Sequence, residues 1–276
     1  MKIFLTGGTG FVGSHFINKA HSVGHEIIAL RRPGSETRIR LEKQPTWIEG
    51  SLDDDWSVQM IGCEVFVHFA AHSANTPYDT LSNCNYWNVY VSTKLAEQAI
   101  KSKIRKFLVA GSCFEYGSSA ARYEKIPPNA PLEPTLSYPI SKAAASISFA
   151  GLSAENDLYV KILRLFQVYG EGEQETRLWP SMRKAALEGL DFNMSPGEQI
   201  RDFIDVVDAS AVFVEELDFT NNSSGKALIK NVGSGVSISL RDFSEKWWKQ
   251  WGAKGTIFFG SLPYRKNEIM RLVPEL

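Results

Sequence analysis

The sequence is poor in cysteine and has no long apolar segment. Its 276 residues include three cysteines, Cys63, Cys84 and Cys113. Because this number is small and odd, we expect reduced thiols in a cytoplasmic protein and no disulfide framework. No Cys/His cluster has zinc-ligand spacing, so no metal site is expected. No apolar run approaches the ~20 residues of a membrane helix, and no signal-peptide pattern opens the chain, so we expect no membrane partner.

The sequence also lacks a surplus of charge of either sign. Lys and Arg number 30 against 31 Asp and Glu, which gives a net charge of −1. Without a basic surplus or a long Lys/Arg run, we expect no nucleic-acid partner. The hydrophobic content of 43% is typical of a globular protein. The chain is long enough for one large domain or two smaller ones.

Glycine is concentrated near the N-terminus. Residues 2–6 (KIFLT) predict a short buried strand, and Gly7-Gly8-Thr9-Gly10-Phe11-Val12-Gly13 follows it directly. A strand, a glycine-rich turn and a helix start, in that order, form a cradle for a pyrophosphate. The alternative is a tight turn without a ligand. We predict a dinucleotide site whose cofactor-binding residues here are Gly7, Gly10, Phe11, Val12 and Gly13.

The remaining pattern predicts an α/β fold with a Rossmann-type, doubly wound parallel sheet. Further strands are expected at 25–30, 46–49, 64–71, 106–112 and 159–165, with helices at 86–101 and 139–156. After residue 165 the alternation is less regular. We expect a dinucleotide-binding domain over residues 1–165, with residues 203–232 packing back onto it. Residues 166–276 would mainly form a smaller C-terminal substrate-binding cap.

One pentapeptide, Tyr138-Pro139-Ile140-Ser141-Lys142, has the residues for proton transfer. If Tyr138 begins a helix, Lys142 lies one turn along on the same side. A lysine charge ~4 Å from the phenol contributes roughly 4 kcal/mol at an effective dielectric near 20, which would lower the phenol pKa by about 3 units. Tyr138 could then exchange a proton with a carbinol oxygen. Ser112, at the end of the expected strand 106–112, could hydrogen-bond the same oxygen.

Several segments together resemble the extended short-chain dehydrogenase/reductases, in the nucleotide-sugar epimerase/dehydratase family. The resemblance extends over almost the whole chain. It is carried by TGGTGFVG (6–13), HFAA (68–71), Asn88-Val89, GSCFEYG (111–117), YPISK (138–142), LRLFQVYGEG (163–172), RDFIDVVD (201–208) and LPYRKNE (262–268).

The resemblance implies roles for residues in these segments. Ser112, Tyr138 and Lys142 would be catalytic, and Lys142 would also hold the ribose of the cofactor. Further cofactor contacts are implied for Ser51, Leu52, Phe69, Ala70, Ala71, Asn88, Leu165 and Phe166. Substrate contacts are implied for His72, Ser112, Gln167, Arg201 and Arg265, the last three toward a nucleotide diphosphate. A homodimer through helices 86–101 and 139–156 is also implied.

Two departures from the family pattern are informative. The second expected strand ends in Arg31-Arg32, where many members have a carboxylate for the ribose 2′-hydroxyl. These arginines could hold a 2′-phosphate, so NADP(H) is favoured and NAD(H) remains possible. Cys113 and Phe114 stand where dehydratases of this family have Asp-Glu, which argues against water elimination.

We therefore predict an NADP-dependent reductase of a nucleotide-activated sugar, acting on a 4-keto-6-deoxyhexose with Tyr138 as the proton donor. One alternative is a nucleotide-sugar 4-epimerase with tightly bound NAD. A second is a reductase of a small aldehyde or ketone without a nucleotide. A third, from another class, is a non-catalytic NADP-binding sensor.

Overall fold

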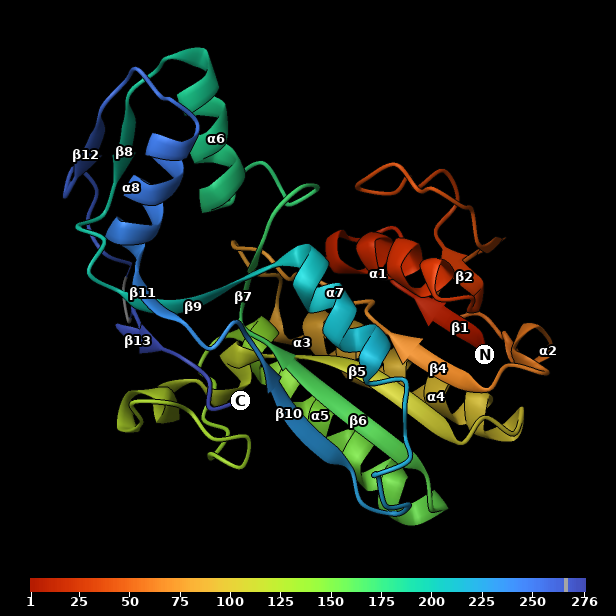
Figure 1. Ribbon diagram of the computed structural model, residues 1–276. Coiled ribbons are helices and arrows are strands. Elements are labelled where there is room, and N and C mark those ends of the chain that lie inside the picture. The colour runs from red at the N-terminus through yellow and green to blue at the C-terminus, as the bar shows by residue number, and fades with distance from the viewer. Residues whose placement is uncertain (266–267) are drawn as a thin grey trace.

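The computed structural model describes residues 1–265 and 268–276. Its centre is a seven-stranded sheet with the order β10-β6-β5-β4-β1-β2-β3 (Figure 1). Every neighbouring pair in this sheet is parallel. The predicted doubly wound parallel sheet is thereby confirmed. Its strands are β1 (Lys2–Thr6), β2 (Glu26–Arg31), β3 (Thr46–Glu49), β4 (Val65–His68), β5 (Lys106–Ser112), β6 (Tyr159–Leu165) and β10 (Leu228–Val232).

Both faces of this sheet are buried under helices. In β1, Ile3 and Leu5 belong to one apolar core and Phe4 belongs to the other, because side chains alternate across a strand. Helices α1 (Phe11–Ser22) and α7 (Val206–Glu215) cover the first face. Helices α4 (Ser92–Lys101) and α5 (Ser137–Asn156) cover the second (Figure 1).

Two expected elements differ in the structure. The strand expected at 64–71 ends at His68, where Phe69 N–H donates the last bond to Thr6 O and its ring packs against Phe213. The helix expected at 86–101 is longer and irregular. It begins as α3 (Leu81–Asn85), passes through a π-helix, η1 (Tyr86–Val91), and continues as α4. Thr80 caps its start by accepting a hydrogen bond from Asn83 N–H.

The second half of the chain builds two small sheets. One has four strands, with β9 at its centre, and the other pairs β8 with β12. Helices α6 and α8 lie beside the two-stranded sheet (Figure 1). Aromatic rings join these helices, since Trp179 of α6 lies 5.5 Å from Trp247 of α8. The elements are β7 (Gln167–Tyr169), α6 (Leu178–Glu188), β8 (Phe192–Met194), β9 (Ile200–Asp205), β11 (Ser237–Ser239), α8 (Leu240–Gln250), β12 (Ile257–Phe259) and β13 (Arg271–Leu272).

The chain crosses between these two regions three times, after β6, after β9 and after β10. After β9 it returns to the large sheet, where α7 packs on α1 and β10 pairs with β6. Three short helices complete the described part: α2 (Ser57–Met60) and the 3-10 helices η2 (Cys113–Tyr116) and η3 (Ser118–Arg122). Within residues 1–265 and 268–276, no helix has the length and apolar character to cross a membrane.

Candidate active site

The glycine turn leaves a cradle between β1 and α1. Gly7 has φ +75°, and a Cβ there would lie 2.5 Å from Ala70 N, so the turn requires glycine. A Cβ on Gly13 would lie 2.1 Å from Gly7 O, which explains the close packing of α1 on the turn. A Cβ on Gly10 would meet only Gly7 O within 4 Å, at 3.1 Å. The space before Gly10 and the first turn of α1, with Phe11 and Val12, therefore fits a pyrophosphate.

The two arginines at the end of β2, which the sequence predicts for a 2′-phosphate, differ in their contacts. Arg31 donates to Glu49 Oε1 from both Nε (2.9 Å) and Nη2 (2.6 Å), and its guanidinium lies 5.0 Å from the Trp47 ring centroid. Arg31 is thus already paired across the strand edge, whereas Arg32 is exposed. Of the two arginines, Arg32 has the side chain more accessible to a ligand.

The loop after β3 is held by its own hydrogen bonds. Ser51 N–H donates to Asp54 Oδ2 at 2.7 Å, and Ser51 Oγ accepts from Asp53 N–H. Leu52 packs against the core of the α4 face. The Asp53 carboxylate in turn accepts from Tyr86 Oη at 2.7 Å and from Lys94 Nζ at 2.9 Å. This loop is therefore tied to the helix that carries η1 and α4.

Ser112 and Tyr138 meet at the edge where the parallel strands end. Ser112 is the last residue of β5 and caps η2, and Tyr138 lies in the first turn of α5. The Ser112 hydroxyl lies close enough to the Tyr138 phenol to oppose the rise in the phenol pKa. The Tyr138 ring packs against that of Tyr78, with centroids 5.4 Å apart. Both side chains are buried, and both lie at this end of the sheet.

The expectation that Lys142 lowers the pKa of Tyr138 is wrong for this structure. Burial raises the pKa of the phenol, and Tyr78, Glu115 and Cys113 raise it further. The Lys142 ammonium lies one turn along the helix, as expected, but donates to Ala110 O at 2.7 Å. Lys142 is not among the groups that oppose this rise, so the phenol stays protonated at neutral pH.

Asn88 holds the start of α5 in place. Its Nδ2 donates to Ser141 Oγ at 2.9 Å and to His72 O at 3.1 Å, and its Oδ1 accepts from His72 N–H at 2.6 Å. Ser141 Oγ donates to Tyr138 O at 2.8 Å. Because these contacts occupy its amide, Asn88 is placed to position the tyrosine turn, with its role toward the cofactor still a prediction.

Glu115 forms a buried ion pair beneath the serine. Its Oε1 accepts from Ser112 N–H at 2.7 Å, and its Oε2 accepts from Arg164 Nε and from Ser146 Oγ, both at 2.8 Å. The Glu115 side chain is fully buried and that of Arg164 is 2% exposed. This network links β5, β6 and α5 directly below the site.

The loop after β4 approaches the glycine turn through its backbone. Ala70 N and the Phe69 carbonyl carbon face Gly7, while Ala71 is exposed. His72, expected near the substrate, pairs with Asp79 at 2.7 Å within this loop. A substrate contact of His72 stays a prediction.

Leu165, at the end of β6, and the two residues after it have different surroundings. Leu165 packs on the α1 face, and Phe166 is buried in a cluster with Cys113 and Tyr116. The ring of Phe166 is thus used for packing. Gln167 Nε2 donates to Cys113 Sγ at 3.8 Å. Burial raises the pKa of Cys113 to about 12, so this thiol is protonated and its role is in packing and contact.

The sequence predicts substrate contacts for two arginines, Arg201 and Arg265. Arg201 is buried and donates from Nη2 to Glu268 Oε1 at 2.7 Å. Arg265 is exposed, and its charge opposes the rise in the pKa of Tyr78 caused by burial. The charge of Arg201 acts in the same sense on Cys113. Both cations therefore lie within electrostatic range of the groups around Tyr138.

Sequence reasoning missed Tyr78, Arg177 and Glu173. The charge of Arg177 acts on both Tyr78 and Cys113, so this arginine also lies within electrostatic range of the site. Arg177 is the N-cap residue of α6 and pairs with Glu173. The sequence signals were its place directly before a helix and its spacing of four residues from Glu173, whereas its proximity to Tyr78 depends on how two loops fold together.

The comparisons with known proteins agree with this geometry. A family model described as "NAD dependent epimerase/dehydratase family" matches residues 3–233. CDP-abequose synthase of Salmonella muenchen is 28% identical over 276 residues, covering 98% of this chain and 87% of that protein. The dTDP-6-deoxy-L-talose 4-dehydrogenase (NAD(+)) of Aggregatibacter actinomycetemcomitans is 26% identical, covering 98% of each chain.

Among solved structures, the UDP-glucose 4-epimerase of Thermotoga maritima with UDP-glucose is similar in fold. Its TM-score is 0.87 at 21% identity, and the match covers all of this chain and 90% of that one.

Proposed function

Because this chain belongs to the NAD dependent epimerase/dehydratase family, we propose that it transfers hydride from NADPH to the 4-keto group of a nucleotide-activated 6-deoxyhexose. Membership makes the chain an NAD(P)-dependent oxidoreductase or epimerase of the extended short-chain dehydrogenase/reductase type, within a family of nucleotide-sugar enzymes. The direction of the reaction, the sugar and the preference for NADP are our proposals.

The observation that carries the proposal is the placement of two buried hydroxyl side chains at one end of the large sheet, Ser112 at the end of β5 and Tyr138 in the first turn of α5. In the proposed reaction the reduced nicotinamide supplies hydride to the carbonyl carbon. Tyr138 donates its phenol proton to the carbonyl oxygen, and Ser112 hydrogen-bonds the same oxygen. A raised phenol pKa suits a proton donor, because the proton is present at neutral pH. Lys142 would hold the nicotinamide ribose close to this point.

The residues of the first half fit a dinucleotide. The diphosphate would lie on Gly7, Gly10 and Gly13 and on the backbone of Phe11 and Val12. We propose the further cofactor contacts where the sequence suggested them. These residues are Ser51, Leu52, Phe69, Ala70, Ala71, Asn88, Leu165 and Phe166. The division into a dinucleotide-binding domain (1–165, with 203–232) and a cap (mainly 166–276) is proposed on the same basis.

One relative supports reduction at C4 of the sugar. A 4-dehydrogenase of a dTDP-6-deoxyhexose, run in reverse, reduces a 4-ketone, and that protein matches almost the full length of this chain. Cys113 and Phe114, next to Ser112, are not an acid and a base for water elimination. The alternative of a 4-epimerase is favoured by the name of another relative, a UDP-glucose 4-epimerase of Corynebacterium glutamicum.

Arg32 is the residue that we propose for NADP preference. Its exposed side chain could contact a 2′-phosphate, while Glu49 and Trp47 hold the neighbouring Arg31. Arg32→Ala should then raise the KM for NADPH and leave the KM for NADH nearly unchanged. Equal changes for both cofactors would contradict the proposed contact.

The main experiment is a turnover assay with NADPH and a panel of nucleotide-linked 4-keto-6-deoxyhexoses. We expect oxidation of NADPH by the wild type, and a loss of at least about 100-fold in Tyr138→Phe with NADPH binding retained. Stoichiometric NAD that survives dialysis, together with C4 inversion, would favour the epimerase. Binding of NADPH without turnover of any sugar or small ketone would favour the sensor.

Substrate recognition is proposed for His72, Gln167, Arg201 and Arg265. Arginine suits a diphosphate because its planar guanidinium binds two oxygens at once. If the substrate is a small ketone without a nucleotide, Arg201→Ala and Arg265→Ala will leave KM unchanged. A large rise in KM for the nucleotide sugar is the expected result.

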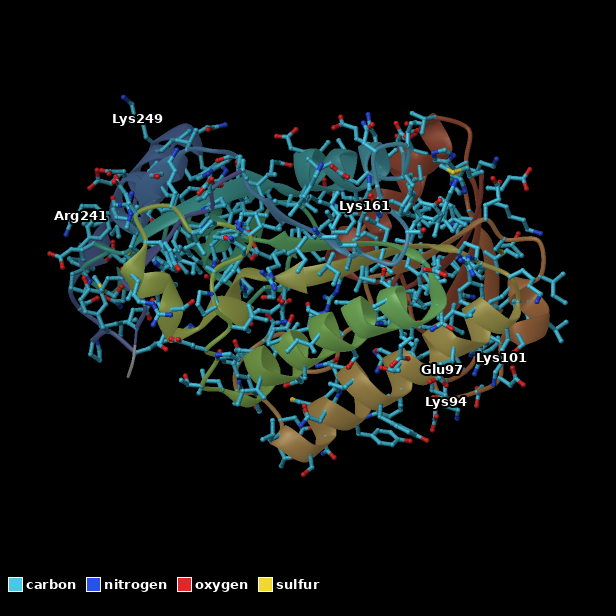
Figure 2. The ribbon with its side chains drawn as sticks, turned by 90° about the horizontal axis from the view of Figure 1, so that it is seen from below. Lys94, Glu97, Lys101, Lys161, Arg241 and Lys249 are labelled. Atoms are coloured by element: carbon cyan, nitrogen blue, oxygen red, sulfur yellow. The ribbon has the colours of Figure 1, made fainter. Side chains whose placement is uncertain are left out.

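We further propose a homodimer through η1, α4 and α5. Tyr86 and Tyr90 of η1 stack on each other and remain 41% and 59% exposed, and Ile147 of α5 is 64% exposed. Figure 2 shows α4 and α5 side by side, with Lys94 on the outer side of α4. Sedimentation should give a dimer that Ile147→Glu converts to monomer.

A cytoplasmic location is also part of the proposal. All three cysteines are buried free thiols, as suits a reducing compartment. Labelling of each thiol in the unfolded protein purified under non-reducing conditions tests this point.

A further inference from the structure

We propose that Glu173 is a positioning residue that orients Arg177 toward the diphosphate of a nucleotide substrate. This inference rests on the proposed function, because it assumes that the site takes a nucleotide-linked ligand. It concerns a side chain for which the sequence suggested no role.

The pair lies in the loop between β7 and α6. Glu173 Oε1 accepts from Arg177 Nε at 3.4 Å. The Glu173 side chain is 8% exposed, whereas that of Arg177 is 35% exposed. The carboxylate is thus buried behind the guanidinium, and the guanidinium extends toward solvent. Because the contact uses Nε, the terminal N–H groups of Arg177 can donate to a ligand oxygen.

The guanidinium lies within electrostatic range of the candidate active site. Its charge opposes the rise in the pKa of Tyr78 and of Cys113, whose burial dominates in both cases. Tyr78 packs against Tyr138. The loop of Arg177 is also tied to the segment that carries Tyr78, since Gln174 accepts a hydrogen bond from Asn75, three residues before Tyr78. Arg177, like Arg201 and Arg265, is therefore a cation within electrostatic range of the site.

One oxygen of the Glu173 carboxylate lacks the hydrogen bonds that a purely structural ion pair would be expected to have. Glu173 Oε2 is buried and has no hydrogen-bond partner among the described residues. A buried carboxylate with a single contact lowers the stability of the folded protein, and each such group in a structure calls for an explanation. Burial raises the pKa of Glu173 to about 7, and Arg177 is the charged group that opposes this rise. The strength of the pair should therefore change near neutral pH.

The test measures binding of UDP-glucose and dTDP-glucose by calorimetry at pH 6, 7 and 8. Both probes keep their diphosphate charge over this range. Glu173→Gln keeps the shape of the side chain and removes its charge, and Glu175→Gln, an exposed acid in the same loop, is the matched control. NADPH binding and the melting temperature report whether each variant is folded.

We expect Glu173→Gln to weaken nucleotide-sugar binding about fivefold at pH 8, which is the effect of one modest ion pair. Wild-type binding should weaken from pH 8 to pH 6, as Glu173 takes up a proton, and Glu173→Gln should lose this difference. In an Arg177→Ala background, Glu173→Gln should have no further effect, because Glu173 acts only through that arginine.

The outcomes separate this inference from the proposed function. If Glu173→Gln binds the nucleotide sugars as tightly as the wild type or more tightly, the inference is overturned and the substrate class is left intact. The same holds if Glu173→Gln weakens binding equally in the wild-type and Arg177→Ala backgrounds. A wild type that binds NADPH but neither nucleotide sugar overturns both.

Discussion

Loss of the Glu115 carboxylate should strongly destabilise the protein. Glu115→Ala leaves the buried guanidinium of Arg164 with Tyr116 Oη at 3.0 Å and Pro128 O at 2.8 Å, but without a counter-charge. Removing one partner of a buried pair costs about 3–5 kcal/mol. At about 2–4 °C per kcal/mol for a chain of this order of size, the melting temperature should fall by roughly 6–20 °C.

The assay is thermal and urea unfolding followed by circular dichroism, with a surface pair as control. Glu133 pairs with Arg122 at 2.8 Å, with side chains 38% and 52% exposed. Glu133→Ala should therefore lose less than about 1 kcal/mol. If Glu115→Ala loses no more stability than Glu133→Ala, the buried network does not have the importance that we assign to it.

Three further predictions follow from the geometry. Gly13→Ala should abolish tight NAD(P)H binding in calorimetry, since its Cβ would lie 2.1 Å from Gly7 O; unchanged affinity would contradict the cradle. Burial, with the Lys142 charge, lowers the pKa of His68 from 6.5 to about 3. The free energy of unfolding should therefore fall as pH decreases from about 6.5 toward 3, by up to about 1.4 kcal/mol per pH unit. His68→Gln should flatten this slope in urea titrations. Asn88→Ala should lower kcat about tenfold or more by releasing the Tyr138 turn, and a normal kcat would show that Asn88 does not position it.

The strands, helices and glycine turn of the first half were predictable because their signals are local. The run Lys2–Thr6 followed by glycines specifies a strand and a turn within a few residues. The Tyr138–Lys142 spacing likewise needs only one helical turn. Burial on both faces of a parallel sheet produces continuous apolar runs, which the sequence displays plainly.

The remaining features depend on contacts between distant residues. The partner of Arg201 is Glu268, 67 residues along the chain, and nothing in either local pattern indicates that pair. The pKa of Tyr138 was predicted in the wrong direction, because spacing reveals a neighbouring charge but not the extent of burial. The short strands β7 and β11 have three residues each, too few for a clear alternation.

The return of the chain to the large sheet has a consequence for dissecting this protein. A fragment ending at Leu165 would lack β10 and expose the hydrogen-bonding edge of β6, and it would uncover the apolar core where Phe213 packs. An open strand edge beside bare hydrophobic surface favours aggregation. Expression trials of an isolated cofactor-binding half should therefore fuse residues 203–232 to residues 1–165. Truncation at Leu165 alone would remove part of the hydrophobic core of that half.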